Sequence, residues 1–339
     1  MLFFLIYKIL FLSSMFIGTI ISISSNTWLG MWIGLEINLL SIIPLMNNKK
    51  MAPSSEAALK YFITQAVASS ILLFSIIFMS IIIFNNKTYD NLMTLIFNSA
   101  LLTKMGMAPF HFWMPEVMEG LTWMNCLIVL TISKFAPMIL LTYNITYNFF
   151  FIIIILLGMM ISGIMGLNQI SLRKIMAFSS INHMSWMITA MFFMNSIFLW
   201  YFLMYTFLSI SIIWMFNYLN IFYIKELIYS INKTFMFKFL FIFNFMSLGG
   251  LPPFIGFMPK WLTIQFLMYE NNIMISFLMI LLTLLTLFYY LRIIYSSLTL
   301  STKKLSYTFY SIPNNFINMS LSMFNISGLM ICVSLCNFT

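Results

Sequence analysis

Long apolar runs follow one another along almost the whole chain, and each is close to the roughly 20 residues that a helix needs to cross a bilayer. The longest polar connections, at about 220–234 and 298–315, are too short to fold as a separate domain. We therefore predict eleven membrane helices. They cover about residues 3–24, 27–46, 56–84, 92–120, 122–144, 148–166, 174–194, 196–219, 235–270, 273–297 and 316–337.

The composition excludes a water-soluble globule. Of the 339 residues, 62% are hydrophobic and 7% are charged, which is more apolar surface than a folded chain of this length can bury. The first apolar run is not followed by a cleavage site and a polar domain, so we expect the N-terminus to be retained. The chain is predicted to be an all-α integral membrane protein.

Several kinds of function are excluded by what the sequence lacks. The net charge of +9 comes from basic residues scattered at segment ends, so nucleic acid is not an expected partner. Cys126, Cys332 and Cys336 have neither the number nor the spacing of a disulfide framework or a metal site. No nucleotide-binding motif occurs. We expect no cofactor and no bond chemistry in this chain.

The basic residues also predict an orientation in the membrane. They lie almost entirely on the side that carries the N-terminus and the loops after even-numbered segments, whereas the other side has only Lys87. The positive-inside rule then places the N-terminus on the cytoplasm-equivalent side and the C-terminus opposite. Glu56 and Lys60, four residues apart at a helix start, predict a surface ion pair.

A short phrase occurs twice and interrupts two of the apolar runs. It reads GMAPFHFWMPE at 106–116 and GLPPFIGFMPK at 250–260, with five of eleven positions identical. Paired interrupted helices in two halves of a membrane protein point to a transport site. Five crossings separate the two copies, so they run in opposite directions. We predict one membrane domain, 1–339, with inverted repeat halves at about 3–144 and 148–297 and a C-terminal helix at 316–337.

Ionisable residues well inside predicted spans are the candidate functional residues. A charge at the centre of a membrane helix costs about 2.5–3.5 kcal/mol on insertion scales, so such groups mark ion or proton paths. The candidates for a proton relay are Glu36, Lys104, Lys134, Lys260 and His183, with His111 as a weaker one.

Glu36 and Lys134 lie near the middle of their spans. Desolvation and a nearby lysine have opposing effects on the proton affinity of a carboxylate, so Glu36 can change protonation when its partner moves. Burial brings a lysine within reach of proton exchange at neutral pH, which is what a relay at Lys134 requires. Pro137 also frees a backbone carbonyl close to Lys134. The alternatives are that Glu36 is hydrogen-bonded only for packing and that Lys134 is a fixed counter-ion.

Lys104 and Lys260 flank the two interruptions, where unwound backbone exposes helix-end dipoles and can hold water. Either could instead snorkel to the membrane surface, more readily Lys260. His183 lies among serine and asparagine side chains that could solvate a proton, although a structural role is equally compatible. The two copies differ in charge, because Glu116 stands in the first where Lys260 stands in the second.

Several strings resemble the family of chain 2 of mitochondrial NADH:ubiquinone oxidoreductase, respiratory complex I. The similarity runs from about residue 5 to 300, and the last 40 residues add nothing to it. The strings are SNTWLGMWIGLEIN (25–38), EAALKYF (56–62), KMGMAPFHFW (104–113), EGLTW (119–123), LRKIMAFSSINH (172–183) and SLGGLPPF (247–254).

This resemblance implies an antiporter-like fold with a shortened N-terminus, in a subunit of the proton-pumping membrane arm. It implies that Glu36 pairs with Lys104, that Lys134 is the central lysine and that Lys260 is the lysine of the second broken helix. The location implied is the mitochondrial inner membrane, with the N-terminus on the matrix side and the C-terminus on the intermembrane-space side.

The same resemblance implies partners and cofactors. Other membrane-arm subunits and lipid, with cardiolipin as a candidate, would surround this chain, while NADH, FMN, iron–sulfur clusters and ubiquinone would bind to other subunits. Two alternatives stay open: a free-standing cation/proton antiporter, and a structural spacer subunit that moves no protons.

Overall fold

The computed structural model describes residues 2–47, 52–82, 90–145, 149–192, 194–231 and 235–299. These residues form fourteen α-helices, and the β-structure among them is a single antiparallel bridge between Ser171 and Tyr223. The all-α prediction is confirmed. The chain divides into two compact units, Met1–Gly158 (unit 1) and Met159–Thr339 (unit 2), which are described in turn.

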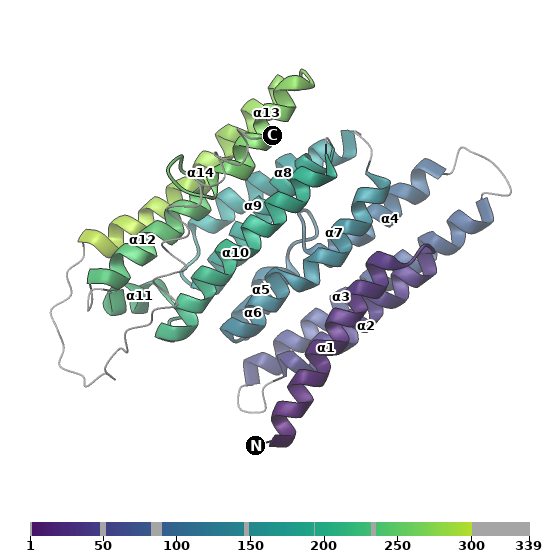
Figure 1. Ribbon diagram of the computed structural model, residues 1–339, viewed down its shortest axis with the longest axis horizontal. Coiled ribbons are helices and arrows are strands. Elements are labelled where there is room, and N and C mark those ends of the chain that lie inside the picture. Colours follow the sequence, from purple (N-terminus) through teal and green to yellow (C-terminus); the bar gives the residue numbers. More distant parts are fainter. Residues whose placement is uncertain are drawn as a thin grey trace. The chain divides into compact units, whose positions relative to one another are not determined.

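Unit 1 is a bundle in which α1 packs along α2, and α3 packs against α2, α4 and α5 (Figure 1). The helix α7 packs against α4 and α1, so it lies inside this unit. The helices are α1 (Leu2–Ser24), α2 (Trp28–Met46), α3 (Ala52–Ile82), α4 (Asp90–Met105), α5 (Trp113–Gly120), α6 (Trp123–Leu130) and α7 (Ile132–Asn144).

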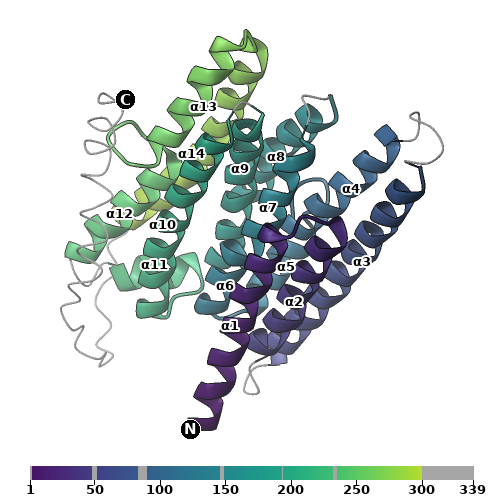
Figure 2. The same cartoon turned by 45° about the vertical axis from the view of Figure 1, so that its right-hand side comes forward.

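Unit 2 is arranged around α9, whose residues are almost all buried from one end to the other. The helices α10, α13 and α14 pack against it (Figure 2). The helix α8 (Phe149–Leu167) begins in unit 1 and ends in unit 2. The others are α9 (Leu172–Met191), α10 (Asn195–Leu219), α11 (Ile224–Ile231), α12 (Phe235–Gly249), α13 (Phe257–Tyr269) and α14 (Ile273–Thr299).

Polar side chains on these helices mostly bond to their own backbone. The hydroxyls of Thr19, Ser75 and Ser162 donate to carbonyls three residues earlier, at 2.7–3.0 Å. The start of α2 is capped by Thr27, whose hydroxyl accepts from the amide of Gly30 at 3.2 Å. Such local bonds satisfy hydroxyl groups without water, which suits a helix surrounded by lipid or by other helices.

The helices follow the predicted apolar runs, with the eleventh run, 316–337, lying outside the described residues. Among the described residues, seven helical segments are long and apolar enough to cross a membrane, and α4 and α12 are shorter apolar helices. The predicted span at 174–194 corresponds to α9, which is not one of the seven. A multi-pass membrane protein is confirmed, whereas the count of eleven crossings stays a prediction.

Two features of the helices were not predicted. The span expected at 122–144 is divided into α6 and α7 at Thr131, and Pro137, which has no amide to donate to the carbonyl of Ser133, lies inside α7. The hydroxyls of Thr131 and Ser133 donate to carbonyls four residues earlier, at 2.8 and 2.7 Å, beside this break. The polar connection at 220–234 contains a short helix, α11.

Candidate functional site

Both copies of the repeated phrase end a helix in the same way. Gly106 and Gly250 have φ of 73° and 75°, a region that favours glycine. In each copy the glycine amide donates to the carbonyl three residues earlier, and the next amide donates to the carbonyl five residues earlier, at 3.0–3.3 Å. This is the Schellman pattern of helix termination. The shared glycine therefore encodes a break rather than a flexible point.

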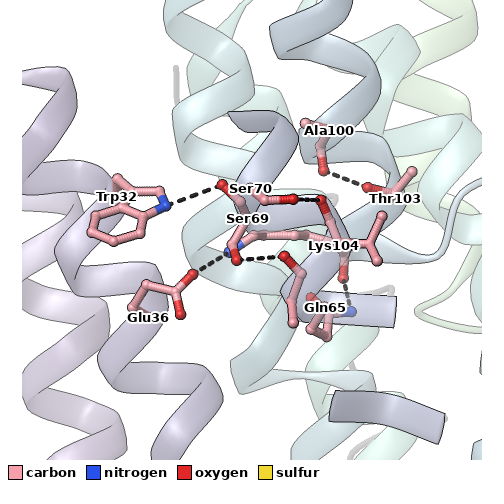
Figure 3. A network of polar contacts seen from close by, with 10 residues as sticks. Trp32, Glu36, Gln65, Ser69, Ser70, Ala100, Thr103 and Lys104 are labelled. Carbon is pink, nitrogen blue, oxygen red and sulfur yellow. Dashed lines mark hydrogen bonds and ion pairs between the residues drawn. The ribbon is translucent and has the colours of Figure 1, made fainter. Parts of the chain in front are cut away.

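Side chains add hydrogen bonds to the backbone carbonyls at the end of α4, next to the first break. The indole nitrogen of Trp113 donates to the carbonyl of Thr103 at 3.1 Å, and the amide nitrogen of Gln65 donates to the carbonyl of Lys104 at 3.2 Å. Trp113 belongs to the repeated phrase, whereas Gln65 reaches across from α3 (Figure 3). The break is thus a fixed, hydrogen-bonded structure.

Glu36 on α2 forms an ion pair with Lys104, with 3.8 Å between a carboxylate oxygen and the ammonium nitrogen. The Lys104 side chain is 3% exposed and that of Glu36 is 24% exposed. One turn before Glu36, the indole of Trp32 donates to the carbonyl of Ser69 at 3.1 Å and so ties α2 to α3 beside the pair (Figure 3). The separation exceeds a direct hydrogen bond, so the pair is held by charge.

A small cavity of about 20 Å³ adjoins Lys104, and this is room for about one water molecule. Its wall includes polar side chains from α2, α3, α4 and α7, among them Ser133, the residue before Lys134. The lining residues are Leu35, Asn38, Leu39, Ile42, Tyr61, Gln65, Lys104, Ser133 and Pro137. The cavity therefore joins the ion pair to the segment of α7 that carries Lys134.

Lys134 lies three residues after the break between α6 and α7 and is only 1% exposed. Its ammonium nitrogen is 3.7 Å from the sulfur of Met114, on the half-helix α5. The same sulfur would lie 3.2 Å from a Cβ atom placed on Gly106. Lys134 therefore contacts a side chain that packs directly on the first helix break.

Lys260, on α13, turns back onto the second break. Its ammonium donates to the carbonyl of Gly249, the last residue of α12, at 2.9 Å. The side chain is buried, so Lys260 does not snorkel outward. A helix C-terminus carries partial negative charge and stabilises a nearby cation. Both breaks thus have a lysine at the end of the first half-helix: Lys104 belongs to α4 itself, and Lys260 comes from the following helix.

His183 lies in the buried middle of α9, and its Nδ1 atom is 3.1 Å from the hydroxyl oxygen of Tyr201 on α10. His111 has its Nδ1 atom 3.2 Å from the carbonyl oxygen of Pro109, inside the first break. The surface pair predicted for Glu56 and Lys60 is confirmed at 2.9 Å, and Lys60 also contacts Glu116 at 3.0 Å.

The predicted residues are distributed between the two units, with Glu36, Lys104 and Lys134 in unit 1 and His183 and Lys260 in unit 2. Three side chains at these sites were missed: Gln65, Trp113 and Tyr201. The sequence signal for Gln65 was its polar side chain within the apolar span 56–84. A polar group inside a membrane helix is costly, so its presence there indicates a role. Among the described residues, no group of three or more His, Cys, Asp or Glu side chains could hold a metal ion.

The chain is similar over most of its length to known proteins. Residues 25–286 match the family described as NADH:quinone oxidoreductase/Mrp antiporter, transmembrane. NADH-ubiquinone oxidoreductase chain 2 of Anopheles gambiae is 52% identical, covering 93% of this chain and 92% of that protein. The Lemur catta protein of the same name is 39% identical, covering 90% of each.

Solved structures share the fold. A chain of respiratory complex I from Thermus thermophilus aligns with a TM-score of 0.82 at 20% identity, over 97% of this chain and 77% of that one. A chain of the Mrp complex from Dietzia sp. aligns with a TM-score of 0.78 at 15% identity, over 95% and 74%. The antiporter-like fold is thereby confirmed. With this fold and these relatives, the chain belongs to the family of NADH-ubiquinone oxidoreductase chain 2, the antiporter-like membrane subunits of complex I.

Proposed function

We propose that this chain contributes to proton translocation across the mitochondrial inner membrane, as a core membrane-arm subunit coupled to electron transfer from NADH to ubiquinone. The observation that carries the proposal is the ion pair between the partly buried Glu36 and the buried Lys104 at a helix break. Buried charges are expensive in a membrane and are retained where an ion or proton moves.

The coupling step begins at this pair. Its 3.8 Å separation lets a displacement of α2 or of the break change the field at Lys104 without breaking a direct hydrogen bond. The adjacent water-sized cavity and the contact of Lys134 with Met114 link that change to Lys134. Lys134 then takes up or releases a proton as the pair loosens or tightens.

The second unit supplies the onward groups. Lys260 on α13 reaches the end of α12 with its ammonium, and His183 lies in the middle of α9. Both are buried side chains that can bind a proton. In this proposal protons pass from Lys134 through water and His183 toward Lys260 or a neighbouring subunit. The repeat halves at 3–144 and 148–297 run in opposite directions within one domain.

The surroundings follow from the same proposal. Other membrane-arm subunits and lipid, including cardiolipin, contact the exposed apolar helix faces, and nucleic acid has no part. NADH, FMN, iron–sulfur clusters and ubiquinone bind to other subunits. The N-terminus lies on the matrix side and the C-terminus on the intermembrane-space side.

Turnover of the purified complex tests the proposal. Lys134→Met is expected to lower NADH:ubiquinone turnover by about 10² or more, since proton transfer groups contribute factors of that size. The matched control, Lys225→Met, removes an exposed lysine from α11 and should leave turnover unchanged. Wild-type turnover in Lys134→Met would favour a structural spacer. Ion-driven pH changes produced by the isolated chain would favour a free-standing antiporter.

A further inference from the structure

Four tyrosines on α10 and α14 form a buried cluster in unit 2. Tyr201, Tyr205, Tyr289 and Tyr290 are each 1–2% exposed. A buried phenol hydroxyl is costly unless it meets a polar partner, whereas phenylalanine fills the same space without that cost. The chain uses Phe 38 times and Tyr 16 times, so phenylalanine is its ordinary aromatic residue. These hydroxyl groups therefore require an explanation beyond packing.

The α10 half of the cluster covers His183. Tyr201 and Tyr205 are four residues apart and so lie on one face of α10. The Tyr201 hydroxyl oxygen is 3.1 Å from Nδ1 of His183, and the Tyr205 ring centroid is 5.2 Å from the imidazole centroid. The Tyr205 hydroxyl lies near that of Ser180, which precedes His183 by one turn of α9, but it forms no hydrogen bond among the described residues. The imidazole thus has phenol groups on the side that faces α10.

The α14 half continues the row of hydroxyl groups. Tyr289 donates to the hydroxyl of Tyr290 at 3.3 Å, and Tyr290 faces the hydroxyl of Ser179 on α9. Ser179 donates its own proton to the carbonyl of Met176 at 2.7 Å, which leaves its oxygen able to accept. Imidazole and hydroxyl groups from three helices therefore lie next to one another in a part of the protein that excludes bulk water.

We propose that Tyr201 and Tyr205 are relay residues that pass protons between His183 and the serine and tyrosine hydroxyls of α9 and α14. Nδ1 of the protonated imidazole gives its proton to the Tyr201 oxygen as the Tyr201 hydroxyl passes its own proton to the oxygen of Tyr290. The excess proton leaves the row of hydroxyls to water, so the imidazole ends neutral and each tyrosine ends unchanged. No electron moves in this step. The inference rests on the proposed function, because it assigns a route to protons that the chain is proposed to carry.

The packing of α9 on α14 does not depend on these hydroxyls. Asn182 donates from its amide to the hydroxyl of Thr286 at 3.0 Å, and this contact ties the two helices independently. Replacing a buried tyrosine by phenylalanine also keeps the ring and its volume. Such variants are therefore expected to assemble, and their defects report on the hydroxyl group itself.

The experiment compares Tyr201→Phe and Tyr205→Phe in the assembled complex, reconstituted in vesicles, with Tyr143→Phe as control. Tyr143 is 55% exposed on α7, outside the cluster. Turnover and its dependence on pH and on deuterated water are measured. The helices α10, α13 and α14 pack against α9, and their buried titratable side chains are Tyr201, Tyr205, Lys260, Tyr289 and Tyr290.

Loss of one relay hydroxyl is expected to lower turnover about fivefold, the factor that corresponds to a barrier about 1 kcal/mol higher. The pH profile should shift and the solvent isotope effect should change in both cluster variants, while Tyr143→Phe matches the wild type. Wild-type turnover, pH profile and isotope effect in both variants, with pumping lost in Lys134→Met, would overturn the tyrosine relay alone. Normal pumping in Lys134→Met would instead overturn the proposed function and the relay with it.

Discussion

Lys260 donates a hydrogen bond from its ammonium to the carbonyl of Gly249, and this 2.9 Å contact joins α13 to the end of α12 across the second helix break. The first break has Lys104 in the corresponding place, at the end of α4, although the two lysines occupy different positions of the repeated phrase. In both units, therefore, a lysine lies at the C-terminal end of the interrupted helix, where the helix dipole is negative.

Two substitutions separate the structural and proton-carrying roles of Lys260. Lys260→Met leaves the Gly249 carbonyl without its donor and should lower the free energy of unfolding by about 1–3 kcal/mol. Lys260→Gln keeps an N–H donor but cannot exchange a proton, so it should melt near the wild type and still pump poorly. Thermal denaturation and vesicle pumping of the two complexes are the measurements. Full pumping in Lys260→Gln would leave Lys260 with a structural role only.

Gly250→Ala is expected to destabilise the second break. The residue has φ of 75°, which costs an ordinary side chain about 1–2 kcal/mol. A Cβ atom there would also lie 2.9 Å from the ammonium nitrogen of Lys260. The matched control is Gly249→Ala, because its Cβ would meet nothing nearer than 3.7 Å. Native gels should show less assembled complex for Gly250→Ala and a normal amount for Gly249→Ala. Equal yields of the two variants would contradict the predicted backbone strain at Gly250.

Gln65→Leu should weaken the first break. The substitution removes the donor to the carbonyl of Lys104, and a buried carbonyl left unpaired costs about 1–3 kcal/mol. Gln169→Leu serves as control, since it removes a comparable bond to Met165 at an exposed site. The melting temperature of the complex is expected to fall in Gln65→Leu and to change little in Gln169→Leu. Equal melting temperatures would show that the Gln65 bond is not needed.

Glu36→Gln tests the coupling of the ion pair between Glu36 and Lys104. It keeps the shape of the side chain and removes its charge, so turnover should fall by about tenfold, within the range of coupling between linked sites. The double variant Glu36→Gln, Lys104→Gln should fall by no more than the worse single variant. Glu56→Gln, in an exposed pair, is the control and should be neutral. Additive losses in the double variant would contradict the coupling.

The sequence predicted the parts of the structure that depend on local chemistry. Gly106 and Gly250, followed by prolines in apolar runs, indicated helix breaks, and the structure has a break with a positive φ at each. The cost of a charge in a membrane singled out Lys134, which is indeed buried. The resemblance implied the pairing of Glu36 with Lys104, and the structure brings these side chains together.

The features that the sequence did not predict depend on contacts between distant segments. The break between α6 and α7 lies at Thr131, six residues before Pro137, and the hydroxyls of Thr131 and Ser133 bond there to the carbonyls of Leu127 and Val129. Tyr201 has no sequence neighbour that marks it, because its partner His183 lies on another helix. Gln65 is one of several polar residues in its span, and what distinguishes it is a bond to the carbonyl of Lys104 on another helix.

The proton-to-electron ratio of the complex carrying Lys134→Met tests the central claim most directly. The complex is reconstituted in vesicles, and proton uptake is measured against NADH oxidation, with Lys225→Met as the matched control. We expect Lys225→Met to keep the wild-type ratio and Lys134→Met to pump fewer protons for each electron pair, in whatever turnover remains. An unaltered ratio in Lys134→Met would contradict the claim that this chain carries protons through its buried lysines.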